Sequence, residues 1–156
     1  MTDRWDQYFL SLCCTAAGMS KDPSTGVGAV IVGPDREVRS MGFNGFPRGI
    51  DDDRRLSDRD TKLRIIVHGE MNAILAAARV GIRVDGCTMY LAARSVDGSI
   101  WGGPPCIRCT VEAIQAGIRE IVSFPLKSSP SRWHDDLAAA HDLLREAGVK
   151  YREVSQ

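Results

Sequence analysis

The sequence predicts an α/β protein in which helices cover a mixed β-sheet, and two observations support this fold class. A valine-rich apolar run at 27–32 and a second run at 38–43 flank the turn Gly33-Pro34-Asp35-Arg36, which is typical of a β-hairpin. After the hairpin, helical and extended apolar patterns alternate to the end of the chain. A hairpin followed by such alternation indicates a sandwich whose sheet has both antiparallel and parallel strands.

The individual elements follow from the spacing of apolar residues and from the turn residues between them. Apolar side chains recur at helical intervals over 5–17, whereas 21–26 holds the Lys, Asp, Pro, Ser and Gly residues of a loop. Gly117 and Gly148 follow two helical patterns and end them. We therefore expect helices at 5–17, 69–80, 106–116 and 135–147, strands at 27–32, 38–43, 88–92, 121–124 and 149–154, and loops at 43–60 and 94–105.

Length indicates a single domain spanning 1–156, and the charge balance weighs against a polynucleotide partner. Hydrophobic residues make up 44% and charged residues 26% of the chain, which are ordinary values for a soluble globular protein. The 20 Lys and Arg residues balance the 20 Asp and Glu residues, so no basic surface for a polynucleotide is expected. Because a neutral chain gains little from charge repulsion, we expect a homo-oligomer, from dimer to hexamer.

The cellular compartment is predicted from the N-terminus and the cysteines. Residues 1–10 lack the apolar core of a signal peptide, and no apolar run approaches membrane-spanning length. The five cysteines are an odd number, which without a secretory signal indicates reduced thiols. We expect a cytoplasmic protein with no membrane contact.

The residues that carry chemistry begin with a Cys-x-x-Cys pair. Cys106 and Cys109 stand three apart at an expected helix start, so both sulfurs can reach one ion and the helix N-terminus favours their thiolates. With His68 they make three ligands, the number a catalytic zinc usually takes from protein. Cys87 as a fourth, structural ligand and two free cysteines without metal are the weaker alternatives.

Glu70 stands two residues after His68, also at a helix start. A glutamate there can simply complement the helix dipole. Beside three zinc ligands it is better interpreted as the catalytic proton carrier, because zinc lowers the pKa of bound water toward about 7 and a nearby carboxylate can move that proton to a substrate. His-x-Glu followed by Pro-Cys-x-x-Cys is the signature of zinc nucleobase deaminases, in which this step replaces an amino group by oxygen.

At this point the chain resembles the deoxycytidylate (dCMP) deaminases of the cytidine deaminase superfamily. The zinc motif is common to the superfamily, whereas the Ser-Lys-Asp-Pro and Asn-Gly-x-Pro segments are narrower and favour the dCMP branch. Matching segments run in family order over nearly the whole chain, from about Trp5 to Arg152. They are 20–25, 27–32, 42–49, 68–74, 86–90, 105–109, 116–118 and 133–135.

The resemblance implies a three-layer α/β/α sandwich with a mostly five-stranded mixed sheet and one zinc ion per chain between two helix N-termini. Asn44 is expected to hydrogen-bond the pyrimidine or sugar, although Asn44-Gly45 can also be a plain turn, and His134 can be no more than the neighbour of an N-capping Asp135. Expected substrate contacts are Ser24, Thr25, Asn44, Gly69, Pro105, Trp133 and His134.

The family also implies control by dCTP and dTTP, bound near the Asn-Gly-x-Pro segment. The alternative interpretation of this stretch is a solvated charged loop. The candidate effector residues are Arg48, Asp51, Asp52, Asp53 and Arg54.

Four departures from the family pattern change these expectations. Ile50 stands where some members have a metal-binding cysteine, so a second zinc is not expected, and Trp133 replaces a common tyrosine. Gly69 replaces alanine; if it lies against the pyrimidine, it makes room for a 5-methyl or 5-hydroxymethyl group. The stretch 94–103 is longer than usual and is interpreted as a lid, a subunit contact or a neutral insertion.

These observations predict zinc-dependent hydrolysis of dCMP to dUMP and ammonia, supplying dUMP for thymidylate synthesis. The alternatives are another cytosine substrate such as dCTP or deoxycytidine, an adenosine in tRNA, or a deaminase fold that only mediates interactions. Neutral charge counts against tRNA, and the complete set of three ligands and Glu70 counts against an inactive module.

Overall fold

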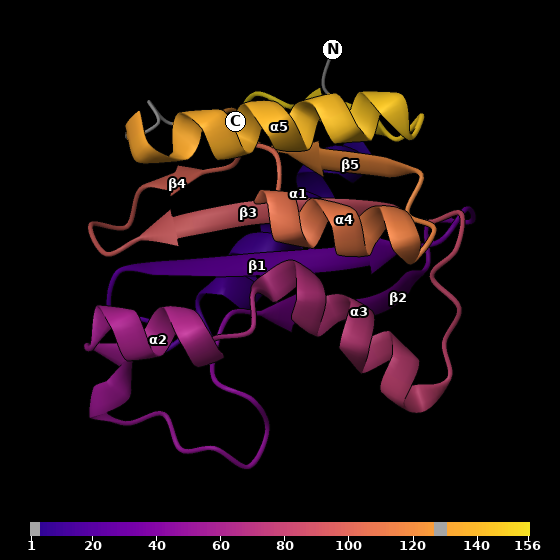
Figure 1. Ribbon diagram of the computed structural model, residues 1–156. Coiled ribbons are helices and arrows are strands. Elements are labelled where there is room, and N and C mark those ends of the chain that lie inside the picture. Colours follow the sequence, from indigo (N-terminus) through magenta and orange to yellow (C-terminus); the bar gives the residue numbers. More distant parts are fainter. Residues whose placement is uncertain (1–3, 127–130) are drawn as a thin grey trace.

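The computed structural model describes residues 4–126 and 131–156, with backbone only at 131–134, and it shows helices on both faces of a mixed sheet (Figure 1). Its helices are α1 (Arg4–Ala17), α2 (Arg59–Ile65), α3 (Gly69–Val80), α4 (Ile107–Gln115) and α5 (Ser131–Glu146), with a short 3-10 turn at Arg54–Leu56. The strands are β1 (Thr25–Val32), β2 (Val38–Phe43), β3 (Thr88–Ser95), β4 (Ile100–Trp101), β5 (Glu120–Ser123) and β6 (Lys150–Glu153).

The sheet has the order β2-β1-β3-β5-β6, and β4 pairs with β3 beside this path. The β1–β2, β1–β3 and β3–β4 pairs are antiparallel, whereas β3–β5 and β5–β6 are parallel. The predicted mixed sheet is confirmed, with six strands rather than five because the 94–105 segment adds β4.

Alternating side chains of the strands form two cores. Val30 and Val32 of β1 pack with Phe9 of α1 on one face. Ala29 and Ile31 point to the opposite face, where α3, α4 and α5 contribute to the second core. The helices at the two faces make this a three-layer sandwich, and none of the helices in the described residues is long and apolar enough to cross a membrane.

Two segments expected to be loops are partly regular. The 3-10 turn Arg54–Leu56 lies within the expected loop 43–60, and helix α2 begins at the end of that loop after Asp58, whose carboxylate caps the helix by accepting from the Thr61 N–H. Strand β3 extends to Ser95 and turns at Asp97-Gly98 into β4, with Gly98 in the left-handed region at φ +82°. Both were missed because aspartates and glycines indicate loops as well as caps and hairpin turns.

Candidate active site

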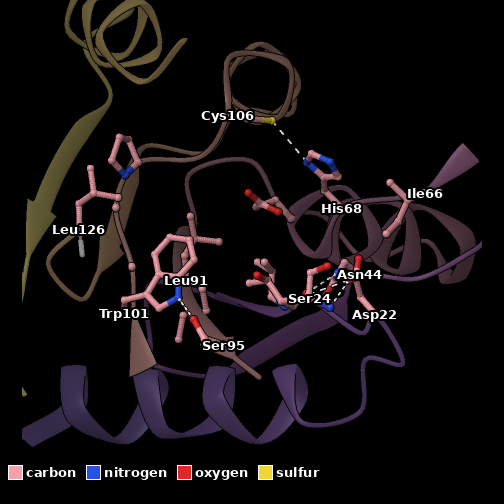
Figure 2. Close-up of a pocket in the computed structure, with 18 of the residues that line it drawn as sticks. Asp22, Ser24, Asn44, Ile66, His68, Leu91, Ser95, Trp101, Cys106 and Leu126 are labelled. Atoms are coloured by element: carbon pink, nitrogen blue, oxygen red, sulfur yellow. Dashed lines mark hydrogen bonds between the residues drawn. The ribbon is translucent and has the colours of Figure 1, made fainter. Parts of the chain in front are cut away.

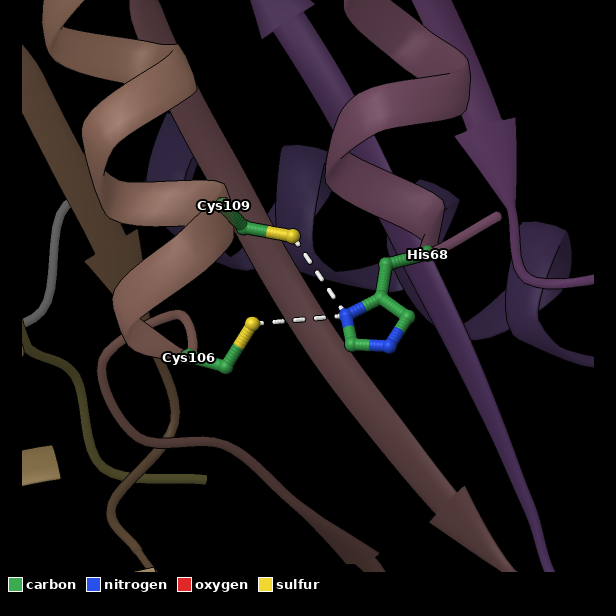
Figure 3. A group of neighbouring side chains, drawn as sticks. All are labelled: His68, Cys106 and Cys109. Atoms are coloured by element: carbon green, nitrogen blue, oxygen red, sulfur yellow. Dashed lines mark hydrogen bonds between the residues drawn. The ribbon is translucent and has the colours of Figure 1, made fainter. Parts of the chain in front are cut away.

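Two helix N-termini bring the three candidate ligands together (Figure 3). His68 is the N-cap of α3 and Cys106 the N-cap of α4, and neither of these two side chains makes a capping hydrogen bond. The Nδ1 atom of His68 lies 3.4 Å from Sγ of Cys106 and 3.4 Å from Sγ of Cys109. Cys87 is buried at the entrance of β3 and does not belong to this group.

The geometry of this group fits a zinc ion. A tetrahedral zinc with ordinary Zn–N and Zn–S bonds separates nitrogen from sulfur by about 3.6 Å, close to both observed distances. All three donor atoms lie within 4.8 Å of one another, and no other such group occurs among the described residues. Three protein donors leave the fourth tetrahedral position for water or substrate.

Electrostatics within the group favour a thiolate, the form that binds metal. The Cys109 side chain, by hydrogen bonding to Cys106, lowers the pKa of Cys106 to about 4. The Cys106 side chain in turn raises the pKa of His68 to about 9. A divalent cation would replace the imidazolium proton as the positive partner of the sulfurs.

Helix α3 is held close to β2, and this contact positions His68. Asn72 donates through Nδ2 to the Phe43 carbonyl at 2.7 Å, and the Ser40 hydroxyl donates to the Ala73 carbonyl at 2.7 Å. Gly42 permits the approach, because a Cβ there would lie 2.4 Å from the Ala73 nitrogen. The absence of a side chain at Gly42 therefore lets the end of α3 that carries His68 lie close to β2.

Glu70 lies in the first turn of α3 with its carboxyl group buried. Its Oε2 atom has no hydrogen-bond partner within the described part of the chain. Burial raises the pKa of Glu70, so this carboxyl group holds a proton more readily than an exposed glutamate. An unpartnered buried carboxyl oxygen requires a partner, which water or substrate beside the metal would supply.

A cavity of about 470 Å³ opens beside these residues and has one polar and one apolar side (Figure 2). His68, Glu70 and Cys106 line one end. The side that holds Asp22, Ser24 and Asn44 carries most of the polar groups and also Ile66, whereas the side that holds Trp101 and Leu126 is mostly apolar and also carries Ser95. The lining further includes Thr25, Arg59, Lys62, Leu91, Ala92, Ala93 and Pro104.

Comparison with known protein families and structures identifies the family to which this fold and site belong. The protein-family model described as the cytidine and deoxycytidylate deaminase zinc-binding region matches residues 3–124 of this chain. This chain belongs to that deaminase family. The resemblance inferred from the sequence is thereby confirmed, and the chain is a hydrolytic deaminase.

Individual relatives extend the similarity over nearly the whole of this chain. Deoxycytidylate deaminase of Homo sapiens is 35% identical over 155 residues, covering 96% of this chain and 79% of that protein. An uncharacterized deaminase from the luxG 3′ region of Aliivibrio fischeri is 34% identical over 152 residues, covering 96% and 93%. The structure of cyanophage S-TIM5 dCMP deaminase in complex with dCMP and dUMP has a TM-score of 0.77 at 21% identity, covers 99% of both chains, and confirms the fold.

Asp22 organises the polar side of the deaminase cavity. Its Oδ1 atom accepts from the Ser24 N–H at 2.8 Å and from Lys62 Nζ at 3.1 Å. The Asp22–Lys62 ion pair is almost buried, with 6% and 11% of the two side chains exposed. Lys62 Nζ also lies 3.5 Å from Ser24 Oγ. A hydroxyl and a lysine are thus fixed together against the cavity.

Asn44 lines the cavity but has its amide bound to β1. Its Oδ1 accepts from the Val27 N–H at 2.6 Å, and its Nδ2 donates to the Thr25 carbonyl at 2.9 Å. Only the second lone pair and the second amide hydrogen remain for a ligand. The expected contact of Asn44 with substrate therefore depends on these remaining positions.

Gly69 does not lie where the sequence suggested. A Cβ at position 69 would point at the Val27 carbonyl oxygen, 2.7 Å away, and Gly69 does not line the cavity. Glycine is present because the start of α3 packs on the β1 backbone, and the expectation of extra room for a 5-substituent at this position is wrong.

The remaining expected substrate residues are placed as follows. Pro105 is buried behind the cavity lining, where its carbonyl accepts from the Thr110 hydroxyl at 3.3 Å. The side chains of Trp133 and His134 lie outside the described residues.

The candidate effector residues form an exposed charged loop away from the cavity lining. Asp53 accepts from the Arg55 N–H and pairs with its guanidinium at 2.8 Å. Asp52 pairs with Lys21 at 3.3 Å. The side chains of Arg48, Asp51 and Arg54 are exposed.

Asp22, Arg59, Lys62 and Trp101 are among the cavity-lining residues that were not predicted from the sequence. Arg59 and Lys62 lie on one face of α2, and Trp101 lies on β4. The spacing of Arg59, Lys62 and Ile66 at i, i+3 and i+7 was the available signal for α2. For Trp101 the signal was the Asp-Gly turn within an unusually long connection.

Proposed function

We propose that this deaminase hydrolyses dCMP to dUMP and ammonia, using one zinc ion held by His68, Cys106 and Cys109. The observation that carries the proposal is the unpartnered Oε2 of Glu70, buried beside the three ligands at one end of a nucleotide-sized cavity. The product serves as the precursor for thymidylate synthesis.

A zinc ion bound by these ligands would supply a water molecule of lowered pKa next to the pyrimidine. Glu70 takes up a proton from the attacking water and delivers it to N3, which makes C4 electrophilic. It then carries a second proton to the amino group. The C4–N bond breaks as the new C4–O bond is retained, so water and cytosine give uracil and ammonia. The raised pKa of Glu70 suits a group that must hold a proton between these transfers.

The polar side of the cavity supports a nucleotide rather than a free base. Arg59 and Lys62 are the Lys and Arg side chains among the described residues of the lining, and Ser24 adds a hydroxyl beside Lys62. Phosphate oxygens are best bound by such charge-assisted donors. We infer that the 5′-phosphate lies on this side, with Ser24, Thr25 and Asn44 toward the sugar.

The experiment is to measure ammonia release from dCMP, dCTP, CMP and deoxycytidine by the zinc-loaded protein. The highest kcat/KM is expected for dCMP. A higher kcat/KM for dCTP or deoxycytidine would show that the preferred substrate is not dCMP. If none of the four compounds released ammonia, deamination of cytosine nucleotides would be refuted.

Effector control is a second proposal, based on the charged loop at 48–54. We propose that dCTP activates and dTTP inhibits a homo-oligomer through this loop. Sedimentation with and without each nucleotide, together with dCMP saturation curves, tests it. A monomer with hyperbolic kinetics that neither nucleotide changes would contradict this control.

A further inference from the structure

The β3–β4 hairpin brings an aromatic side chain into the cavity. Trp101 of β4 lines the apolar side, across from Ser24 and Asn44 in Figure 2. Among the described lining residues it provides the one indole, and no Phe or Tyr lines the cavity there. The segment that carries it, 94–103, is the stretch that the family resemblance leads us to expect to be longer than usual.

Trp101 is held in place from three directions. It pairs with Ala93 across the hairpin, and its indole Nε1 donates to the Ser95 hydroxyl at 2.9 Å. The next residue, Gly102, donates its N–H to the Pro125 carbonyl at 3.1 Å. A Cβ on Gly102 would lie 2.2 Å from the Phe124 carbonyl oxygen, so close packing against the end of β5 fixes this backbone.

The same stretch of chain leads directly to the metal ligands. Gly103 donates to the Phe124 carbonyl at 3.0 Å and to the buried Ser123 hydroxyl at 3.1 Å, and Cys106 follows three residues later. Trp101 and Cys106 are therefore positioned by one anchored segment. A fixed aromatic ring loses little conformational entropy when a ligand packs on it.

We propose that Trp101 is a specificity-determining residue that stacks on the pyrimidine ring of the substrate. The proposal rests on the proposed function and names its base-binding subsite. Arg59, Lys62 and the Ser24 hydroxyl lie on the opposite side, where we place the phosphate and sugar, whereas the Ser95 hydroxyl on this side accepts the hydrogen bond of the Trp101 indole. The flat base is left facing the apolar side, and its C4 must reach Glu70 and the ligands at the adjoining end.

The test compares Trp101→Ala, Trp101→Leu and Trp101→Phe with the parent on dCMP. Losing a base–aromatic stack weakens binding by about 5- to 150-fold, so the KM of Trp101→Ala should rise in that range while kcat changes by less than about threefold. Trp101→Phe restores a ring and should bring KM back near the parent. Trp101→Leu restores apolar volume without a ring and should not.

Product binding provides a readout that is independent of turnover. Titration with dUMP should quench tryptophan fluorescence in the parent and in a Trp5→Phe, Trp133→Phe double variant, in which Trp101 is the one remaining indole. The Trp101→Phe variant should lose most of this quenching. Val96→Ala, at an 85% exposed position of the same hairpin, is the matched control and should keep the parent KM.

The outcomes separate this proposal from the proposed function. A folded Trp101→Ala with the parent KM, or a Trp101→Leu that recovers as fully as Trp101→Phe, overturns the stack and leaves dCMP deamination standing. If the parent releases no ammonia from dCMP, the proposed function fails. The variants are then compared on dUMP binding, where equal affinities of Trp101→Ala and the parent overturn the stack.

Discussion

The reacting end of the cavity and its nucleotide-binding sides are built in different ways. The reacting end takes its four groups from two short segments, 68–70 and 106–109, each at the start of a helix. The nucleotide-binding sides are assembled from the 22–25 loop, Asn44, helix α2, strand β3 and the hairpin. Chemistry that depends on local spacing is therefore visible in a sequence, whereas a surface that gathers distant segments depends on the fold.

The largest expected effect lies at the reacting end. Cys106→Ala removes one of three ligands and should yield protein with little bound zinc and no measurable turnover. Metal content by mass spectrometry checks this. Cys87→Ala, which changes a buried cysteine away from the group, is the control and should keep its zinc. A zinc-free Cys87→Ala would instead make Cys87 a ligand.

Glu70→Gln separates metal binding from proton transfer at the same end. The amide cannot carry a proton, so kcat should fall by about 10² to 10⁴ or more, while zinc content stays normal. Glu112→Gln on α4 is the control, because that carboxylate pairs with Arg108 at 3.4 Å and does not line the cavity. Near-parent activity of Glu70→Gln would assign the proton transfers to another group.

On the nucleotide-binding side, smaller and substrate-dependent effects are expected. Arg59→Ala should raise the KM for dCMP about 10- to 100-fold, because it removes one charged hydrogen bond to the phosphate. The KM for deoxycytidine, which has no phosphate, should change little. Arg64→Ala, exposed on α2 and outside the cavity lining, is the matched control. Equal changes in KM for dCMP and deoxycytidine would show that the 5′-phosphate does not bind on this side of the cavity.

The smallest effect is expected in stability. Gly69→Ala places a methyl group against the Val27 carbonyl and should lower the free energy of unfolding by about 1–3 kcal/mol, as overpacking commonly does. Urea unfolding of the zinc-loaded protein measures it. Gly45→Ala, where a Cβ meets nothing within 4 Å, is the control. Unchanged stability of Gly69→Ala would show that β1 and α3 separate easily.

How much the sequence could predict follows the same division. The β1–β2 hairpin, the order of helices and strands and the grouping of His68 with the two cysteines depend on local periodicity and spacing, and they were predicted. Helix α2 was missed because its cap, Asp58, lies in an aspartate-rich stretch. The environment of Gly69 could not be predicted, because its neighbour Val27 is distant in sequence and only the packing of α3 on β1 brings them together.

The hydrogen bonds around Asn44 also bear on how this protein ages. In an Asn-Gly pair the glycine nitrogen can attack the side-chain amide, which slowly converts asparagine to aspartate or isoaspartate. Here the Gly45 N–H donates to the Val67 carbonyl at 3.1 Å, and both polar atoms of the Asn44 amide are held by β1. We expect deamidation at Asn44 to be slow in the folded protein and fast in urea, which peptide mass spectrometry of stored samples would reveal. Equal rates in both conditions would mean that this segment opens freely.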